Sequence, residues 1–448
     1  MARLYITYND LFRFCFIRCF YLHLPPMKTK FKIFKYTLVF QLFASIALAG
    51  ILIPMDNEQS NHLKAYGVAF YALESGMNVE WLLNYRGGSF YIDYSEMIEK
   101  ECLLRDVTYE RISSSDYARI NTEIESKNMA IILLEKAPKI AVYTPPNKLP
   151  WDDAVTLALT YAEIPYEKIY DKEILDNALK DYDWLHLHHE DFTGQYGKFF
   201  GNYRNAAWYI TEQQTQEQLA SDLGFAKVSK LKLAVAEKIR SYVVNGGFLF
   251  AMCAATDSYD IALAARNTDI CQTPFDHDGV DPNYNEKLDY KQSFAFTDFK
   301  LNSDPYVYEF SDIDVPPSYD ALRINPARDY FSLFEFSAKF DPVPCMLTQN
   351  HESLIKGFMG QTTSFDRDKI KQHVLIMGET KNTNRVKYIH GNVGKGTFTY
   401  YGGHDPEDYR HYVGDPPTNL DLHKNSPGYR LILNNVLFPA AKKKERKT

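Results

Sequence analysis

Cysteine is scarce in this 448-residue chain, which has only six, and no two of them form a Cys-x-x-Cys pair. Four remain after residue 49, and they are far apart in the sequence. So few cysteines exclude a disulfide-stapled scaffold and leave room for a free thiol. No apolar run long enough to cross a bilayer occurs after residue 60, which excludes a multi-pass membrane protein.

Positive charge is also in short supply outside the first 49 residues. Residues 1–49 carry seven Lys and Arg and one Asp, a net charge of +6, whereas the whole chain is −7, so the remainder carries −13. A domain this acidic repels phosphates, and we therefore expect no nucleic-acid partner. The basic end, residues 442–448, is interpreted as a solvated tail. A content of 45% hydrophobic and 24% charged residues is typical of a packed globular protein and excludes wholesale disorder.

The N-terminus has the pattern of a secretory signal. Four lysines follow Met27 closely, residues 37–46 are mostly apolar, and Ala47-Leu48-Ala49 fits a small-x-small cleavage site. We expect export to the periplasm or the outside of the cell, with Gly50 as the first mature residue and no stable membrane insertion after cleavage. The alternative is an uncleaved anchor, because residues 37–53 are nearly long enough to span.

Strand-like and helix-like segments alternate along the rest of the chain, which predicts an α/β fold with a parallel sheet. In the N-terminal part the expected elements are a strand at 51–55, a helix at 60–75, a strand at 79–83 and a helix at 93–105. A linker-like stretch follows, and in the next part of the chain Asp152 is expected to cap a helix. The predicted units are a leader (1–49), an N-terminal Rossmann-like α/β unit (50–137), a core (138–256 and 371–441), a loop-rich insertion (257–370) and the tail (442–448).

One candidate site is the buried strand 248–252, which runs directly into Cys253 and two alanines. Small neighbours suit a nucleophile elbow, the tight turn between a strand and a helix that presents a reactive side chain. Backbone N–H groups after such a turn can form an oxyanion hole and lower the pKa of a thiol. The alternative is that Cys253 is an inert buried residue.

A second candidate follows the predicted strand 397–401, where His404 is followed by Asp405 and Glu407. A His at the carboxyl end of a strand, with an acid within three residues, supplies the base and the orienting carboxylate of a Cys–His–acid triad. The alternative is a polar loop at the end of the sheet.

The third candidate is a run of ligand-type residues at a strand end. His186 and His188 share one face of the strand, so both can bind one metal ion with a nearby carboxylate. Substrate binding and a structural polar network are the alternatives, and the cofactor is left open. The run consists of His186, His188, His189, Glu190 and Asp191.

The elbow and the His-Asp-Pro-Glu segment together resemble the class I glutamine amidotransferase-like fold. Residues 395–404, a glycine-led strand ending in Gly-Gly-His, also resemble the closing segment of its trehalose-utilisation (ThuA-like) branch. The resemblance implies a flavodoxin-like parallel sheet with Cys253 as nucleophile, His404 as base and Glu407 as orienting acid, with Asp405 competing for that last role. Both glycines that usually flank the elbow Cys are alanines here.

The chain after its leader is also similar to an exported bacterial family that commonly carries the name asparagine synthetase B. Residues 186–194, 357–361 and 426–435 carry that similarity. A synthetase of that name uses an N-terminal Cys and a Ser-Gly-Gly-x-Asp-Ser loop, and this sequence has neither. We therefore take the name without its mechanism.

Three functions are consistent with these observations. The first is an exported amide hydrolase using Cys253, His404 and Glu407. The second is a non-catalytic protein of the cell envelope that binds an amide-bearing or sugar ligand. The third is a metal-dependent hydrolase centred on His186 and His188. Residue patterns give no oligomeric state.

Overall fold

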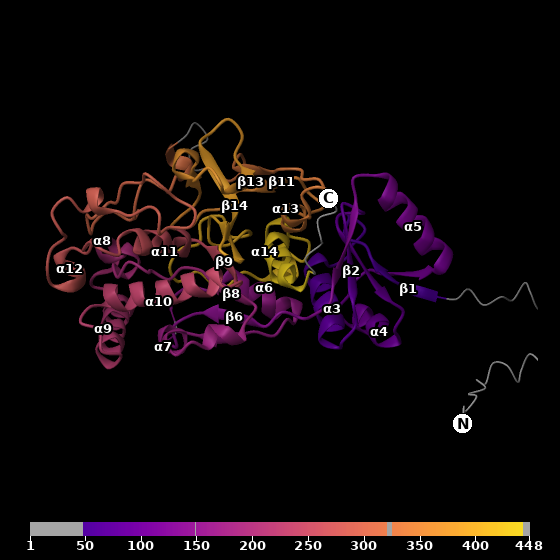
Figure 1. Ribbon diagram of the computed structural model, residues 1–448, viewed down its shortest axis with the longest axis horizontal. Coiled ribbons are helices and arrows are strands. Elements are labelled where there is room, and N and C mark those ends of the chain that lie inside the picture. The colour runs from indigo at the N-terminus through magenta and orange to yellow at the C-terminus, as the bar shows by residue number, and fades with distance from the viewer. Residues whose placement is uncertain (1–47, 148, 320–324, 442–448) are drawn as a thin grey trace, which may run out of the picture. The chain divides into compact units, whose positions relative to one another are not determined.

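A computed structural model describes residues 48–147, 149–319 and 325–441 (Figure 1). The predicted leader, up to residue 47, and the predicted basic tail lie outside the described residues. Within the described part of the chain, no helix is both long and apolar enough to cross a membrane.

A five-stranded sheet lies in the N-terminal part, in the order β4-β1-β3-β2-β5. Here β1 and β2 each pair antiparallel with β3, and β2 pairs antiparallel with β5. The prediction of a parallel, Rossmann-like unit is therefore wrong, because strand and helix periodicity carries no information about pairing direction. The strands are β1 (Leu48–Ile53), β2 (Val79–Leu83), β3 (Ser89–Asp93), β4 (Glu110–Ser113) and β5 (Ala130–Leu134).

Three helices accompany this sheet. The predicted first helix is confirmed as α3, where the Asn61 side chain accepts a hydrogen bond from the Lys64 N–H and so caps the helix. The stretch taken as a linker instead holds β4, β5 and a helix with a capping box between Ser113 and Asp116. The helices are α3 (His62–Glu74), α4 (Glu96–Leu104) and α5 (Ser114–Ser126).

A ten-stranded mixed sheet organises the rest of the chain, in the order β11-β10-β13-β14-β15-β9-β8-β6-β7, with β12 paired to β14. Five neighbouring strands of this sheet, β7, β6, β8, β9 and β15, run parallel. Beyond β15, the strands β14, β13, β10 and β11 extend the sheet with antiparallel pairing. The parallel strands are β6 (Ile140–Tyr143), β7 (Glu167–Ile169), β8 (Trp184–Leu187), β9 (Phe248–Met252) and β15 (Gly396–Tyr401); the others are β10 (Tyr330–Leu333), β11 (Leu354–Lys356), β12 (Phe365–Asp366), β13 (Leu375–Glu379) and β14 (Arg385–Val393).

Helices pack on both faces of the parallel strands, because alternate strand side chains point to opposite faces. Ile140 and Val142 belong to a core shared with α6 and α14, whereas Ala141 and Tyr143 belong to a core shared with α7, α10 and α11. Figure 1 shows α14 in yellow beside α6, and α10 and α11 farther along the sheet. These helices are α6 (Ala154–Ala162), α7 (Asp171–Leu175), α10 (Val228–Val244), α11 (Ala254–Ala264) and α14 (Pro427–Leu437).

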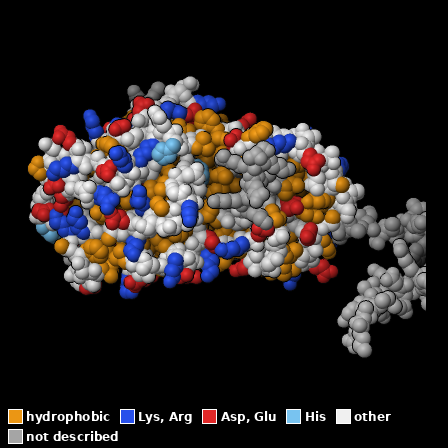
Figure 2. Space-filling model, viewed as in Figure 1, with side chains coloured by type: hydrophobic (Ala, Val, Ile, Leu, Met, Phe, Trp, Pro, Cys, Tyr) orange, Lys and Arg blue, Asp and Glu red, His pale blue; other side chains and the backbone are white. Residues whose placement is uncertain are grey.

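The predicted insertion is mostly loops and short elements after α11 ends at Ala264, but its strands β10 and β11 also widen the main sheet. Figure 2 shows Lys and Arg side chains interspersed with Asp and Glu side chains over the face viewed. Acidic and basic groups therefore alternate on that face and do not separate into fields of one sign. The remaining helices are α8 (Phe200–Tyr203), α9 (Ala207–Asp222), α12 (Thr273–Asp276) and α13 (Pro342–Leu347).

Candidate metal centre

Seven imidazole and carboxylate side chains meet at the carboxyl edge of the parallel strands, and we call them the histidine cluster. They come from the loops that follow β6 and β15 and from the end of β8. In open α/β sheets this edge is where ligands bind, because the loops after parallel strands converge there. The histidine cluster consists of Asp152, Asp153, His186, His188, His189, His404 and His411.

Buried polar atoms without hydrogen-bond partners are concentrated in this cluster. Both Asp152 carboxylate oxygens are buried and make no hydrogen bond with any described residue. Buried polar groups almost always have hydrogen-bond partners. The many unpaired atoms at this point therefore indicate a place where a ligand binds. The other unpaired cluster atoms, within the described ranges, are Nε2 of His186, both ring nitrogens of His188, Nδ1 of His189, Nε2 of His404 and Nε2 of His411.

The first ligand group surrounds the Asp152 carboxylate. Its Oδ1 lies 3.8 Å from His404 Nε2 and 3.2 Å from His411 Nε2. His411 Nδ1 lies 3.2 Å from Asp408 Oδ2, which accepts only, so Nδ1 is the donor to Asp408 and Nε2 is the nitrogen that faces Asp152. A cation between Nε2 and the Asp152 oxygen can bind both atoms. Ligand atoms about 2.0–2.1 Å from a tetrahedral ion lie roughly 3.3 Å apart, close to the spacing seen here.

The second ligand group surrounds Asp153. His186 Nε2 lies 3.3 Å from Asp153 Oδ2, and His188 Nδ1 lies 3.3 Å from Asp153 Oδ1. The prediction that His186 and His188 share one face is confirmed, since both rings contact the same carboxylate. Asp153, and not Asp152 as predicted, is the N-cap of α6, because its Oδ1 accepts hydrogen bonds from two N–H groups of the first turn.

Burial decides the protonation of these rings. Burial, together with the charge of His188, lowers the pKa of His404 to about 3. Burial also lowers the pKa of His186 and carries the pKa of His189 well below its ordinary value. At His188 burial is outweighed by the Asp153 carboxylate, which raises the pKa of that ring. His186, His189 and His404 are therefore neutral at pH 7, and each offers a lone pair that a metal ion can use.

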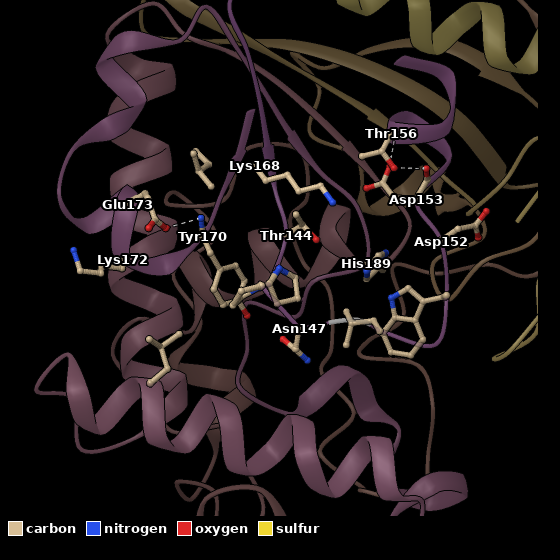
Figure 3. Close-up of a pocket in the computed structure, with 16 residues that line it drawn as sticks. Thr144, Asn147, Asp152, Asp153, Thr156, Lys168, Tyr170, Lys172, Glu173 and His189 are labelled. Carbon is tan, nitrogen blue, oxygen red and sulfur yellow. Dashed lines mark hydrogen bonds between the residues drawn. The ribbon is translucent and has the colours of Figure 1, made fainter. Parts of the chain in front are cut away.

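A cavity of about 610 Å³ lies beside the cluster. Asp152, Asp153 and His189 line it, and Figure 3 shows them on one side, away from Lys172 and Glu173. Small-molecule sites commonly have about this volume. Asp152, Asp153 and His189 therefore connect the cluster to a space of the size that a small molecule fills.

Cys253 lies on a tight turn between a strand and a helix, as predicted for a nucleophile elbow. Cys253 lies between β9 and α11 with φ 51° and ψ −139°, a conformation that costs free energy for a residue other than glycine. The expected lowering of the thiol pKa is wrong: burial raises it to about 11, although the Gln361 N–H, 3.3 Å from Sγ, partly opposes this. The thiol is 3% exposed.

A backbone hydrogen bond links the Cys253 turn to the segment that carries His404. The Cys253 N–H donates to the Gly403 carbonyl, one residue before His404. Among the described contacts, no hydrogen bond or ion pair joins the Cys253 thiol to the His404 ring. Glu407 lies 3.1 Å from His423 Nδ1, and Asp405 accepts the Glu407 N–H at 2.8 Å. The triad therefore stays a prediction, and His404 lies in the histidine cluster.

The two acids predicted as partners of the His run lie beside the cluster in other roles. Glu190 Oε1 lies 3.6 Å from His189 Nε2, and burial followed by the Asp153 charge raises the Glu190 pKa to about 8. The Asp191 carboxylate accepts the N–H groups of Thr193, Gln195 and Gly197, so it shapes the loop after β8.

Sequence reasoning missed Asp152, Asp153 and His411 as site residues. Asp152 and Asp153 follow a proline-rich loop and read as a helix cap, while His411 lies in a loop without periodicity. One signal was available: the Asp-Asp pair lies in the loop after a parallel strand, at the same sheet edge as His186 and His188.

No protein-family model matches the chain, and no curated protein matches it. Among solved structures, the cytoplasmic protein STM3548 of Salmonella typhimurium is 10% identical, with a TM-score of 0.33, over 68% of this chain and 100% of its own. The cytoplasmic protein STM1381 of Salmonella typhimurium LT2 is 11% identical, with a TM-score of 0.34 and the same coverage. A catalytic mutant of Gan42B, a GH42 β-galactosidase from G. stearothermophilus, is 12% identical, with a TM-score of 0.24, over 59% of this chain and 27% of its own. Likenesses this distant carry no argument about function.

Proposed function

We propose that this protein is a metal-dependent hydrolase whose catalytic ion is bound by Asp152, His404 and His411. One observation carries the proposal: three side chains from two distant loops converge, and their facing oxygen and nitrogen atoms are buried and make no hydrogen bond within the described part of the chain. Imidazole and carboxylate donors suit zinc and similar transition-metal ions. Asp408, behind His411, is the carboxylate that such sites use to hold a ligand ring in place.

The donor set determines what the ion can do. Asp152, His404 and His411 would hold the ion with three protein ligands, as in catalytic zinc sites, and an ion held there would supply Lewis-acid activation of water for hydrolysis. Because Asp152 lines the cavity, the substrate is a small molecule, and we expect an amide-bearing or sugar-derived compound.

The test measures metal content and hydrolysis on the same full-length preparations. We expect purified protein to contain zinc, to lose amide or ester hydrolysis on chelation, and to regain it on adding zinc. His404→Ala loses the metal and the activity, whereas His423→Gln, which changes a histidine outside the cluster, keeps both. Protein that binds no transition metal even after exposure to zinc overturns the proposal, and protein that binds zinc without hydrolysis supports only a ligand-binding role.

A second candidate function is the thiol hydrolase, favoured by the elbow backbone of Cys253. The parallel strands β7-β6-β8-β9-β15, numbered along the chain, give the order 2-1-3-4-5 of flavodoxin-like sheets, which supports the proposed glutamine amidotransferase-like core. Cys253→Ala abolishes activity if the thiol is the nucleophile and leaves it intact if the ion does the chemistry.

Export is also part of the proposal. Gly50 lies within β1 and pairs with Asp93, so cleavage before Gly50 removes the first two residues of that strand. Sequencing the N-terminus of protein recovered from the periplasm or medium tests this cleavage, and an intact N-terminus on cytoplasmic protein contradicts it.

A further inference from the structure

Asp153 and two histidines, His186 and His188, form a second donor group in the cluster. Its carboxylate lies 3.3 Å from a nitrogen of each ring, Oδ2 facing His186 and Oδ1 facing His188. Both rings are fully buried, and neither ring nitrogen makes a hydrogen bond in the described part of the chain. The Asp153 carboxylate and the two ring nitrogens make three protein ligands that converge on one point.

The tautomer of His186 is fixed by its other nitrogen. Nδ1 lies 3.2 Å from the Phe250 carbonyl, which can only accept, so Nδ1 carries the proton. Nε2 of the neutral ring therefore presents a lone pair to Asp153 Oδ2. Two lone pairs in contact in a dry interior repel each other, and a cation between them converts the repulsion into two bonds. The Phe250 carbonyl then holds the ring in place behind the ion, as is common for metal-bound histidine.

The carboxylate itself is held firmly before any ion binds. The N–H groups of Val155 and Thr156 each donate to Asp153 Oδ1 at 2.8 Å, which ties the side chain to the first turn of α6. His186 lies in β8, with its ring stacked against Trp184 and Phe250 at centroid distances of 5.9 and 5.7 Å. Donors on rigid elements form a site that needs little rearrangement to bind an ion.

We propose that the chain binds a second transition-metal ion, of the zinc type, between His186 Nε2, His188 Nδ1 and the Asp153 carboxylate. Asp153 lines the cavity, but the His186 and His188 rings are fully buried and do not, so two of the three ligands hold this ion away from solvent and it acts structurally, joining the end of β8 to the start of α6. The inference rests on the proposed function in one respect: the structural ion is the second of a pair, and the first is the proposed catalytic ion at Asp152.

The test counts ions in the full-length chain saturated with zinc and freed of excess, for wild type and three variants. His186→Phe keeps the aromatic stack and removes the donor, His411→Ala removes a ligand of the first ion, and His390→Phe changes a buried histidine outside the cluster. We expect two zinc ions per chain in wild type and in His390→Phe, and one in each of the other two variants. In wild type, a chelator should remove one of the two ions more slowly than the other.

The possible outcomes separate the two proposals. One ion that His411→Ala removes and His186→Phe retains overturns the second site and leaves the proposed function standing. One ion that His186→Phe removes and His411→Ala retains supports the structural site and overturns the proposed catalytic one. No ion in wild type overturns both. If His186→Phe does not fold, Co²⁺ titration of metal-free wild type, followed by visible absorbance, counts the sites: saturation at one equivalent overturns the inference, and saturation at two supports it.

Discussion

His404 and His411 stack with ring centroids 4.0 Å apart and planes inclined by 19°, and both turn Nε2 toward the same Asp152 oxygen. Stacked rings that aim their nitrogens at one carboxylate are pre-organised around a point a metal ion can occupy. The stack joins His404, three residues after the end of β15, to His411, seven residues later, so the position of β15 in the sheet determines where the proposed metal site lies.

The first prediction concerns Asp408, which holds His411 through Nδ1. Asp408→Asn should weaken zinc binding roughly 10- to 100-fold, because the ring loses its orienting carboxylate while the ligands themselves remain. Competition with a chromophoric chelator measures the change. Asp421→Asn, which alters a carboxylate away from the cluster, should leave the affinity unchanged; equal losses in both variants would contradict this role for Asp408.

The second prediction concerns Cys253. With a thiol pKa raised to about 11 by burial, only a small fraction is thiolate at neutral pH, so iodoacetamide should modify Cys253 more slowly than a free thiol. Peptide mapping by mass spectrometry at pH 7.5 gives the rate for each cysteine. Modification of Cys253 faster than a model thiol would contradict the prediction and favour the thiol hydrolase.

The third prediction concerns stability in mild acid. Burial, followed by the Arg430 charge, lowers the pKa of His62 from 6.5 to about 4. The unfolded chain therefore binds more protons than the folded chain between these values, so His62 makes stability fall as pH drops from 6.5 to 4. The loss is about 3 kcal/mol at most for this shift. His351, stacked on His62, has its pKa lowered to about 3 by burial and the same arginine, and acts in the same direction.

Urea unfolding at several pH values checks this dependence. His62→Gln should flatten the slope of the unfolding free energy between pH 6.5 and 4, and His373→Gln, at an exposed position, should not. An unchanged slope in His62→Gln would show that other groups cause the acid sensitivity.

The fourth prediction concerns a buried ion pair. Lys232 Nζ lies 2.9 Å from Asp171 Oδ2, and both side chains are almost fully buried. Lys232→Met leaves the Asp171 charge without its partner, which should cost about 3–5 kcal/mol of unfolding free energy. Lys172→Met breaks the exposed pair with Asp176 and should cost less than about 1 kcal/mol. Chemical denaturation measures the unfolding free energy of both variants. Similar losses of unfolding free energy in the two would contradict the prediction.

The sequence by itself determined the local features. Strand alternation placed His186 and His188 on one face, and small residues around Cys253 predicted the turn that the backbone adopts. The apolar spacing of residues 60–75 predicted the first helix to within about two residues at either end. Each of these features depends on neighbours a few positions away, so local patterns suffice.

Only the tertiary structure decided the site. Asp152 and His411 are brought together because β15 lies beside β9 in the same sheet as β6, and no local pattern encodes a contact across that distance. Burial is likewise a property of the whole fold: it raises the Cys253 pKa against the backbone hydrogen bonds that lower it, the largest of them from Gln361. Pairing direction also depends on long-range contacts: the N-terminal strands alternate with helices along the chain, which predicted a parallel sheet, but they pair antiparallel. Long-range packing, which a single sequence does not display, placed His404, a predicted triad residue, within the histidine cluster.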